Sequence, residues 1–452
     1  MVEENGTGSQ STEGRGERPM NRHASLSLNR LTGLPGPKIW YSNINWEQTK
    51  SMEGIRLPRI SNAEGDRLVG QMDLYQIYLA DEPDTVLLSS RPDPGFLDYV
   101  RGEGAALPRI AIAAGDRSGR DERFVRSTAV PYLVDEKEER FLRSHECGWI
   151  GPPADLALRL NSKIETRRLC ERVGLDVSDG RVCTGTRDIR SAIEELDARF
   201  PGSRLVAKTA YGSAGKSLFH IRRKQDADAL LAYFERQVAR GSGDPVVTVE
   251  RWHPVRHHLS AQLFLWNGAC DVLAVTEQKL TDAGVYRGSD LSPSLPPGLA
   301  ERYEDRLREL GRVLLSQGYA GFLGVDSIVD DGGRLIPAVE INARLTMVSY
   351  LLKIRASLLE RRYSRIETRS YDYKLDRRMD FSEFAERVRE NRDPADDRSG
   401  WFVYGYHHGR SEETDRHAYR VSVLHWGIDG EAAGRSRESF ERVLGQWGGL
   451  SA

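Results

Sequence analysis

The chain is poor in cysteine and in long apolar runs. Its four cysteines, at positions 147, 170, 183 and 270 of 452 residues, follow neither a metal-ligand spacing nor a paired disulfide pattern. No apolar run approaches the ~20 residues needed to cross a bilayer, and the polar, glycine-rich N-terminal stretch lacks the apolar centre of a signal peptide. These absences predict a cytoplasmic protein with reduced thiols and without a membrane partner.

A surplus of either charge is also missing. The 65 basic and 67 acidic side chains leave a formal net charge of −2. Because a dedicated nucleic-acid binder usually carries a basic excess on at least one domain, we expect no nucleic-acid partner. Only ten of the 65 basic residues are lysines, so each lysine is informative. Its compact ammonium can insert between phosphates, whereas arginine presents a planar fork.

The length of the chain predicts two or three domains. Residues 1–36, which are polar and glycine-rich, are typical of a disordered tail. Strand-like runs at 85–90 and 109–115, alternating with helical stretches, indicate a small α/β domain over residues 37–153. The expected remainder is a larger domain at 154–360, containing a lid subdomain at about 204–252, and a C-terminal α/β extension at 361–452. The expected fold class is α/β, with α+β character in the larger domain.

Local signals place helices and hairpins within the larger domain. Ser162-x-x-Glu165 is a capping box, which predicts a helix over 161–175. Apolar residues at three- and four-residue spacing predict amphipathic helices at 226–241 and 299–318. Two hairpins are also expected, at 259–278 with an Asn267-Gly268 turn and at 321–345 with the turn sequence DDGG.

The stretch AYGSAGKS at 210–217 differs by one residue from a Walker A phosphate-binding loop, because Ala210 replaces its first glycine. A Walker A loop lies between a strand and a helix whose N-terminal N–H groups face the phosphates. Here strand-like runs lie on both sides, at 204–210 and 216–223, which favours a strand–loop–strand arrangement. Such a glycine-rich turn can still close over phosphates through its backbone N–H groups. An ordinary hairpin turn is the alternative.

Four polar residues near the end of the larger domain suit a metal and an anion. Glu340, Asn342 and Arg344 alternate in the sequence VEINAR, so on a strand their side chains share one face. Asp326 lies on the preceding expected strand, in the apolar run GFLGVDSIV. Carboxylate and amide oxygens suit Mg²⁺, and an arginine can hold an anionic substrate group bidentately. A solvent-facing strand edge is the alternative, but carboxylates among apolar residues need a metal or a cation as partner.

Two lysines occupy locally unfavourable positions. Lys163 lies in the first turn of its expected helix, where a positive charge opposes the helix dipole. Lys208 follows the apolar run LVA in an expected core strand, where an unpaired ammonium is costly. Lys216 and Lys279 lie in the same region, and these four are among only ten lysines in the chain. This concentration indicates a site for an anion.

In their order along the chain, these features resemble the ATP-grasp superfamily over roughly residues 155–355. Members of that family have a helix with a lysine, a strand with a lysine, a glycine-rich loop, a hinge strand with a glutamate, an acidic strand and a Glu-x-Asn-x-Arg strand. The matching positions here are Lys163, Lys208, the loop 211–216, Glu250 in VTVERWHP, Asp326, Glu340, Asn342 and Arg344. Ala343, where many members have proline, and Lys216, a cation that many members lack, depart from the pattern. The preceding α/β domain is also similar to that of peptide ligases of secondary metabolism, including the pheganomycin type.

The resemblance implies an ADP-forming carboxylate–amine ligase that uses ATP with one or two Mg²⁺ ions, or with Mn²⁺. It assigns phosphate contacts to Lys163 and Lys208, and metal binding to Asp326, Glu340 and Asn342. The loop that closes over the phosphates would comprise Tyr211, Gly212, Ser213, Ala214, Gly215 and Lys216. Contacts along the adenine would come from Glu250, Arg251, Trp252 and His253. The catalytic cations would be Lys208, Lys279 and Arg344, with Arg344 on the acyl-phosphate oxygens.

The implied chemistry is phosphorylation of an amino-acid-like carboxylate, followed by attack of an amine or a peptide on the acyl phosphate. Such chemistry depends on positioning and charge rather than on a protein nucleophile. Two alternatives stay open, namely transfer to the thiol of a carrier protein and a non-catalytic nucleotide-binding protein, although the intact metal ligands argue against the second. A homodimer is a further expectation. Arg256, His257, His258 and Arg287 are either pocket residues or surface charges.

Overall fold

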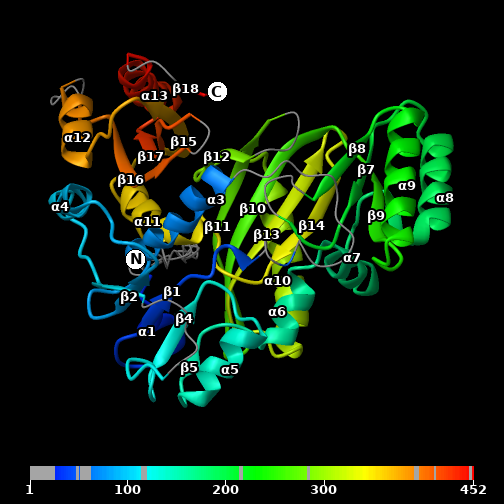
Figure 1. Ribbon diagram of the computed structural model, residues 1–452, viewed down its shortest axis with the longest axis horizontal. Helices are drawn as coiled ribbons and strands as arrows, with labels where there is room; N and C mark the ends of the chain where they lie inside the picture. The colour runs from blue at the N-terminus through cyan, green and yellow to red at the C-terminus, as the bar shows by residue number, and fades with distance from the viewer. Residues whose placement is uncertain are drawn as a thin grey trace, which may run out of the picture.

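The computed structural model describes residues 26–46, 50, 63–113, 120–212, 217–281, 286–390, 396–411, 414–446 and 450–451, which form three β-sheets flanked by helices (Figure 1). Helix α1 (Leu28–Thr32) lies near the start of this part, and Leu26 and Leu28 are buried in the core. The expectation of a disordered tail over residues 1–36 is therefore wrong for residues 26–36, whose apolar side chains reach the core. Residues 1–25 lie outside the described residues. None of the helices described is long and apolar enough to cross a membrane.

The first sheet is parallel and follows the order β3-β2-β1-β4-β5. Its strands are β1 (Ile39–Tyr41), β2 (Thr85–Leu88), β3 (Arg109–Ile112), β4 (Thr128–Pro131) and β5 (Gly148–Trp149). The intervening helices are α3 (Ala63–Gly70), the 3-10 helix η1 (Gln71–Tyr78), α4 (Pro94–Gly102) and α5 (Glu136–Ser144). Parallel strands joined by helices confirm the predicted α/β class. Strands β2 and β3 confirm the two predicted strands, but only β2 is buried as expected, since every side chain of β3 is partly or fully exposed.

The second sheet is antiparallel, with the order β6-β9-β7-β8, and Figure 1 shows its two helices together on one side of the molecule. Its elements are β6 (Gly180–Thr184), α8 (Gly185–Arg199), β7 (Leu205–Lys208), β8 (Leu218–Ile221), α9 (Lys224–Ala239) and β9 (Val246–Arg251). The predicted start of the lid subdomain, residue 204, is therefore too late in the chain. Strand β6, at residues 180–184, already belongs to this sheet because it pairs with β9. Since β7 pairs directly with β8, which is the next element among the described residues, the Walker A arrangement is excluded.

The third sheet has the order β14-β13-β10-β11-β12-β15-β17-β16, with β18 beside β15. Its strands are β10 (Val255–Trp266), β11 (Ala269–Leu280), β12 (Tyr286–Asp290), β13 (Gly321–Asp330), β14 (Leu335–Asn342), β15 (Arg365–Leu375), β16 (Ser399–Arg410), β17 (His417–Gly427) and β18 (Leu450–Ser451). Both expected hairpins are present, and Asn267 and Gly268 turn the first with φ angles of 47° and 80°. The C-terminal strands extend the same sheet through the pairing of Asp290 with Glu367.

Helices cover the third sheet and bury its apolar residues in two cores. Helices α6 (Ala154–Leu160), α7 (Lys163–Arg172) and α10 (Leu299–Ser316) share a core with β10, β13 and β14. The expected capping box of α7 is confirmed in its first half, because Ser162 Oγ accepts a hydrogen bond from the Glu165 N–H (3.3 Å). The Ser162 N–H donates to the Arg159 carbonyl instead of the Glu165 side chain. Further along the chain are η2 (Ser349–Leu351), α11 (Leu352–Glu360), α12 (Phe381–Arg389) and α13 (Gly430–Gly445).

An aromatic core joins the N-terminal domain to the C-terminal strands. Tyr75 of η1 packs against Tyr404 of β16 with ring centroids 5.1 Å apart, and its hydroxyl is 2.7 Å from the Ser422 hydroxyl on β17. The Tyr78 hydroxyl donates to the Tyr404 carbonyl (2.9 Å). Figure 1 shows the consequence, since α3 lies beside β16 and β17 although they are far apart in the sequence. This packing fixes the N-terminal domain beside the strands β10–β14.

Candidate active site

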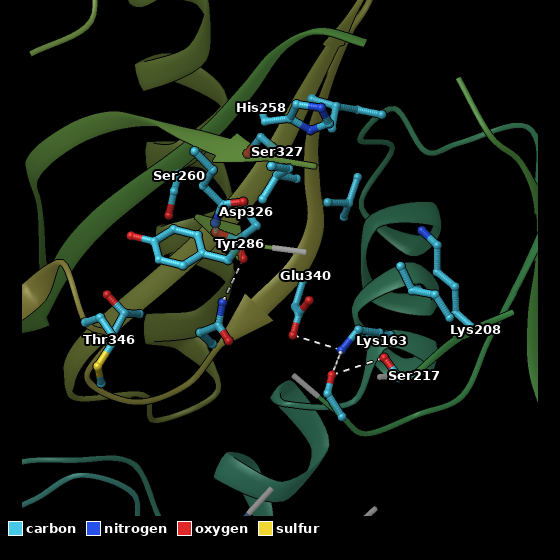
Figure 2. A pocket seen from close by; sticks show the side chains of 18 of the residues that line it. Lys163, Lys208, Ser217, His258, Ser260, Tyr286, Asp326, Ser327, Glu340 and Thr346 are labelled. Atoms are coloured by element: carbon cyan, nitrogen blue, oxygen red, sulfur yellow. Dashed lines mark hydrogen bonds and ion pairs between the residues drawn. The ribbon is translucent and has the colours of Figure 1, made fainter. Parts of the chain in front are cut away.

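A cavity of about 390 Å³ lies between the second sheet, the third sheet and the loops that follow β1 and β4. Figure 2 shows how Lys163 of α7, Lys208 of β7, Asp326 of β13 and Glu340 of β14 meet around it. Lys163 and Glu340 are 177 positions apart in the chain yet form a direct ion pair. The fold therefore brings most of the predicted site residues to one place.

Asp326 and Glu340 are register partners on the adjacent strands β13 and β14, and both line the cavity. Asn342 Nδ2 donates to Asp326 Oδ2 (3.2 Å). Burial and the neighbouring Glu340 carboxylate raise the pKa of Asp326 to about 6. A divalent cation removes this repulsion, and Mg²⁺ prefers such oxygen ligands. No three Asp, Glu, His or Cys side chains converge in the described part of the chain, so the candidate metal site consists of two carboxylates and an amide.

Lys163 connects this carboxylate pair to the loop after β7. Its side chain is 7% exposed, and its ammonium donates to Glu340 Oε1 (2.9 Å) and to the Gly212 carbonyl (2.7 Å). The Ser217 hydroxyl donates to the same carbonyl (3.1 Å), as Figure 2 shows. Glu340 thereby compensates the charge that Lys163 places at the start of α7. The Lys163 ammonium is therefore held at the cavity between Glu340 and Gly212.

Lys208 belongs to a buried cluster of charges that the sequence predicts only in part. Its ammonium is 2.7 Å from Glu250 Oε2, and Arg167 Nη1 donates to Glu250 Oε1 (3.1 Å). Burial opposes the ionisation of Glu250, but Lys208 and Arg167 outweigh it and hold its pKa below the usual value. Glu250 therefore lies behind Lys208, and its side chain contacts cations rather than the main cavity. Sequence reasoning missed Arg167, one of many arginines in the chain.

The hinge between β9 and β10 forms one end of the cavity. Arg251, Trp252 and His253 line it, as predicted for contacts along a base. Burial lowers the pKa of His253, so its ring is neutral near pH 7, and its buried Nε2 has no hydrogen-bond partner among the described residues. The apolar side chains that complete this end are Val206, Leu218, Val255, Ile328 and Val339. An apolar slot lined by such side chains suits an aromatic base.

Arg344 supplies a cation at the other end of the cavity. It follows β14, its side chain is buried, and its guanidinium carbon lies 5.3 Å from the ring centroid of Tyr132. Arg344 Nη1 also donates to the Leu345 carbonyl (3.3 Å). Tyr132 follows β4, so the N-terminal domain takes part in positioning this guanidinium. Sequence reasoning missed Tyr132, because nothing in the stretch VPYLV distinguishes it from a core aromatic residue.

A chain of buried polar contacts connects Asp326 to the turn that carries Arg344. Ser260 on β10 pairs with Asp326 in register, and its hydroxyl hydrogen-bonds that carboxylate. Gln262, two residues later, donates weakly to the Ser260 hydroxyl (3.4 Å). Its Oε1 accepts from Thr346 Oγ1 (2.7 Å) and Ser349 Oγ (2.8 Å). The signal that could have revealed these residues is the alternation of Ser260 and Gln262 within the apolar run LSAQLFLW.

The structure removes Lys279 from the candidate catalytic residues. Its neighbours Gln278 and Leu280 line the cavity, and side chains alternate along β11, so Lys279 points to the other face. There its ammonium pairs with Glu367 of β15. Gln278 contacts the site instead, donating to Asp326 Oδ1 (2.9 Å). The scarcity of lysine does not indicate which face of a strand a lysine occupies.

Two residues of the expected lid loop are described. Gly212 lines the cavity with a φ of 134°, and a Cβ there would lie 2.8 Å from Ser217 Cβ, so glycine is required. Tyr211 is not among the cavity-lining residues, because its ring packs against Trp46 (6.0 Å) and its hydroxyl donates to the Leu158 carbonyl (3.3 Å). Ser213, Ala214, Gly215 and Lys216 lie outside the described residues.

The structure also separates the four residues whose place the sequence left open. His258 lines the cavity. His257 on the same strand turns away, and its Nδ1 lies 2.9 Å from Glu277 Oε1. Arg256 and Arg287 are not among the residues that line the cavity. Of these four candidates, His258 alone joins the site.

Comparisons with known proteins agree with this geometry. A family model described as an ATP-grasp domain matches residues 187–348. The butirosin acyl-carrier protein–L-glutamate ligase of Niallia circulans is 33% identical over 348 residues, which cover 76% of this chain and 81% of that protein. The match therefore extends well beyond the residues around the cavity.

Two solved structures share the fold across nearly the whole chain. N5-carboxyaminoimidazole synthetase from Staphylococcus aureus, complexed with ADP, has a TM-score of 0.53 at 12% identity and covers 93% of this chain and 100% of its own. Phosphoribosylamine–glycine ligase from Thermotoga maritima has a TM-score of 0.55 at 14% identity, with coverages of 92% and 98%. At these identities the likeness concerns the fold.

Proposed function

The chain belongs to the ATP-grasp family of ATP-dependent, ADP-forming ligases, and from that premise we propose that it activates a carboxylate as an acyl phosphate and joins it to an amine. The family membership rests on the Niallia circulans relative, of which the match covers 81%. The assignment of steps to particular side chains, and the choice of an amine as acceptor, are our proposals. The narrower resemblance to pheganomycin-type peptide ligases stays a prediction.

The observation that carries this proposal is the position of the carboxylate pair between cations. Asp326 and Glu340 face each other on adjacent strands, Lys163 contacts Glu340, and Arg344 lies in the same cavity. A protein that only binds nucleotide needs phosphate and metal contacts, but no further arginine in the space beyond them. A carboxylate substrate needs that arginine. The arrangement therefore supports a ligase over a non-catalytic nucleotide-binding protein.

We assign nucleotide binding to the hinge end of the cavity and the two lysines. The base would lie in the apolar slot, with Arg251, Trp252 and His253 along its edge. Lys163 and Lys208 would contact the phosphates. Because Glu250 holds Lys208 by a charged hydrogen bond of 2.7 Å, the ammonium is oriented before the phosphates arrive.

Asp326, Glu340 and Asn342 fit Mg²⁺, which would neutralise charge on the transferring phosphoryl group. Arg344 holds the substrate carboxylate, and Tyr132 keeps the guanidinium in place. One carboxylate oxygen attacks the γ-phosphorus of ATP, the bond from phosphorus to the bridging oxygen breaks, and ADP leaves. The amine nitrogen then attacks the acyl carbon and loses a proton. Inorganic phosphate departs with the electron pair of the C–O bond.

A second candidate acceptor is a group carried on an acyl-carrier protein. The Niallia circulans relative is named for an acyl-carrier protein and L-glutamate. Such an acceptor would attack the same acyl phosphate, through either an amine or a thiol. The residues that bind ATP and the carboxylate are the same in both cases, so the two candidates differ only in the nucleophile.

The test is ADP release over a panel of amino acids, with and without acceptor amines and with a purified acyl-carrier protein. We expect ADP release that depends on both an acid and an acceptor. Glu340→Ala should abolish it while the protein still gives the circular dichroism spectrum of the wild type. If folded, ATP-binding protein releases no ADP with any acid and acceptor, the ligase function is contradicted.

A further inference from the structure

Beyond Arg344, five apolar side chains form one wall of the cavity. They come from three segments, and we call them the apolar wall: Ile44 after β1, Val69 of α3, Met72 of η1, and Met347 and Val348 after β14. Figure 2 shows Thr346, their neighbour in the chain, at the side of the cavity away from Lys208. Met347 and Val348 follow Thr346 directly in the chain, so this part of the apolar wall begins at the side of the cavity away from Lys208.

The apolar wall is anchored in the protein core. Ile44, Met72 and Met347 pack against the aromatic core that joins the N-terminal domain to the C-terminal strands, and Val348 is a buried member of it. The wall therefore keeps its position while part of each side chain lines the cavity. A preformed apolar surface beside a charged group is typical of a small-molecule site in which the charge orients the ligand.

The polar side chains at this end are already engaged within the protein. The Thr346 hydroxyl donates to Gln262, and the hydroxyls of Tyr286 and Ser289 lie 2.8 Å apart. Arg344 is the cation at this end among the described lining residues, and the proposed mechanism uses it for the reacting carboxylate. A second carboxylate on the substrate would therefore meet no further cation among the described residues that line this end of the cavity, and removing an unpaired carboxylate from water is costly.

We propose that the apolar wall binds the side chain of the carboxylate substrate, so that the substrate is an amino-acid-like monocarboxylate with an uncharged, apolar side chain. This inference rests on the proposed ligase function. It separates the chain from its relative named for L-glutamate. Because methionine side chains are flexible and polarisable, Met72 and Met347 favour several apolar side chains of similar size rather than one.

The experiment measures carboxylate activation with hydroxylamine in place of the acceptor. Its nitrogen attacks the acyl phosphate, giving a hydroxamate and inorganic phosphate, so the acceptor need not be known. Leucine, methionine and phenylalanine are compared with alanine, glutamate and lysine. A methylene in an apolar pocket changes kcat/KM by roughly 10-fold or more, so leucine should exceed alanine by roughly 100-fold or more. Equal or better use of glutamate would overturn the inference and leave the ligase function intact.

Variants locate the preference in the apolar wall. Met72→Ala and Met347→Ala should each lower the leucine-to-alanine ratio by roughly 10-fold, with KM for ATP unchanged. Met379→Ala is the matched control, because Met379 is buried in the aromatic core but does not line the cavity. A leucine-to-alanine ratio that stays at the wild-type value in both Met72→Ala and Met347→Ala would contradict the placement of the substrate side chain against the apolar wall. Hydroxamate from none of the acids, with ATP-binding protein, contradicts the ligase function and removes this inference with it.

Discussion

The buried carboxylate of Glu250 should stabilise the second sheet, because it is the counter-charge of two cations. Its side chain is 7% exposed and lies 2.7 Å from the Lys208 ammonium and 3.1 Å from the Arg167 guanidinium. Glu250→Gln preserves the shape of the side chain and removes its charge. Lys208 and Arg167 would then repel each other in a poorly hydrated place.

The structure sets the expected loss of stability in the Glu250→Gln variant. Breaking one side of a buried ion pair costs about 3–5 kcal/mol. Arg167 keeps three partners in the variant, namely Glu171 (2.8 Å), the Ser178 carbonyl (2.9 Å) and the Gly180 carbonyl, so we expect the lower value of about 3 kcal/mol. Glu171→Gln is the matched control, since Glu171 pairs with the same arginine but is 43% exposed. An exposed pair contributes about 1 kcal/mol or less.

Hydrogen exchange of the β7 and β9 amides is the assay, because it reports the local opening of the second sheet in a chain of several domains. A loss of about 3 kcal/mol accelerates exchange by roughly 150-fold where opening is followed by rapid reclosing. Glu171→Gln should change the exchange rate of these amides by less than roughly tenfold. Equal acceleration in the two variants would refute the view that burial sets the strength of this cluster.

Three further changes test other parts of the site and the fold. Asp326→Asn should lower acid-dependent ADP release by roughly 10²–10³-fold without unfolding the protein. The control Asp331→Asn, in an exposed turn, should leave the rate of ADP release unchanged. A rate above a tenth of the wild-type value in Asp326→Asn would contradict the assignment of Asp326 as a metal ligand. Gln262→Leu should lower kcat by roughly 10–100-fold with little change in KM for ATP. The reason is that Gln262 positions Ser260 and the turn that carries Arg344 by hydrogen bonds. A change in KM alone would contradict this positioning role. Burial lowers the pKa of His407 to about 3 from about 6.5, so below pH 6.5 the unfolded chain binds a proton that the folded chain does not. The wild type should therefore lose up to ~1.4 kcal/mol of stability per pH unit between pH 6.5 and 3 through this residue. His407→Gln should lose less on acidification from pH 7 to 5, and an equal fall of Tm in the two proteins would show that His407 is not the cause.

The elements that the sequence predicts well depend on neighbouring residues. The Ser162 cap, the Asn267-Gly268 turn and the alternation in VEINAR are local, and each is where it was expected. The same local patterns explain why Lys163, Asp326 and Glu340 meet, because each follows from its place on a helix start or a strand face.

The parts that the sequence does not reveal depend on contacts between distant segments. The strand β6 joins the second sheet through β9, and the C-terminal strands join the third sheet through Asp290 and Glu367. Arg167 becomes important only when α7 packs beside β9, and Tyr132 only when the N-terminal domain packs beside β14. The error on Lys279 has the same origin, because the face that a strand turns to the cavity is set by its partners.

The most direct test of the central claim, that a carboxylate oxygen attacks the γ-phosphorus of ATP, is an isotope transfer. The acid that gives the fastest ADP release is labelled with ¹⁸O in both carboxylate oxygens, and the inorganic phosphate is examined by mass spectrometry after amide formation. Attack of the carboxylate on phosphorus, followed by release of phosphate from the acyl carbon, predicts one labelled oxygen in every phosphate. Unlabelled phosphate, formed together with the amide, would contradict the acyl-phosphate mechanism.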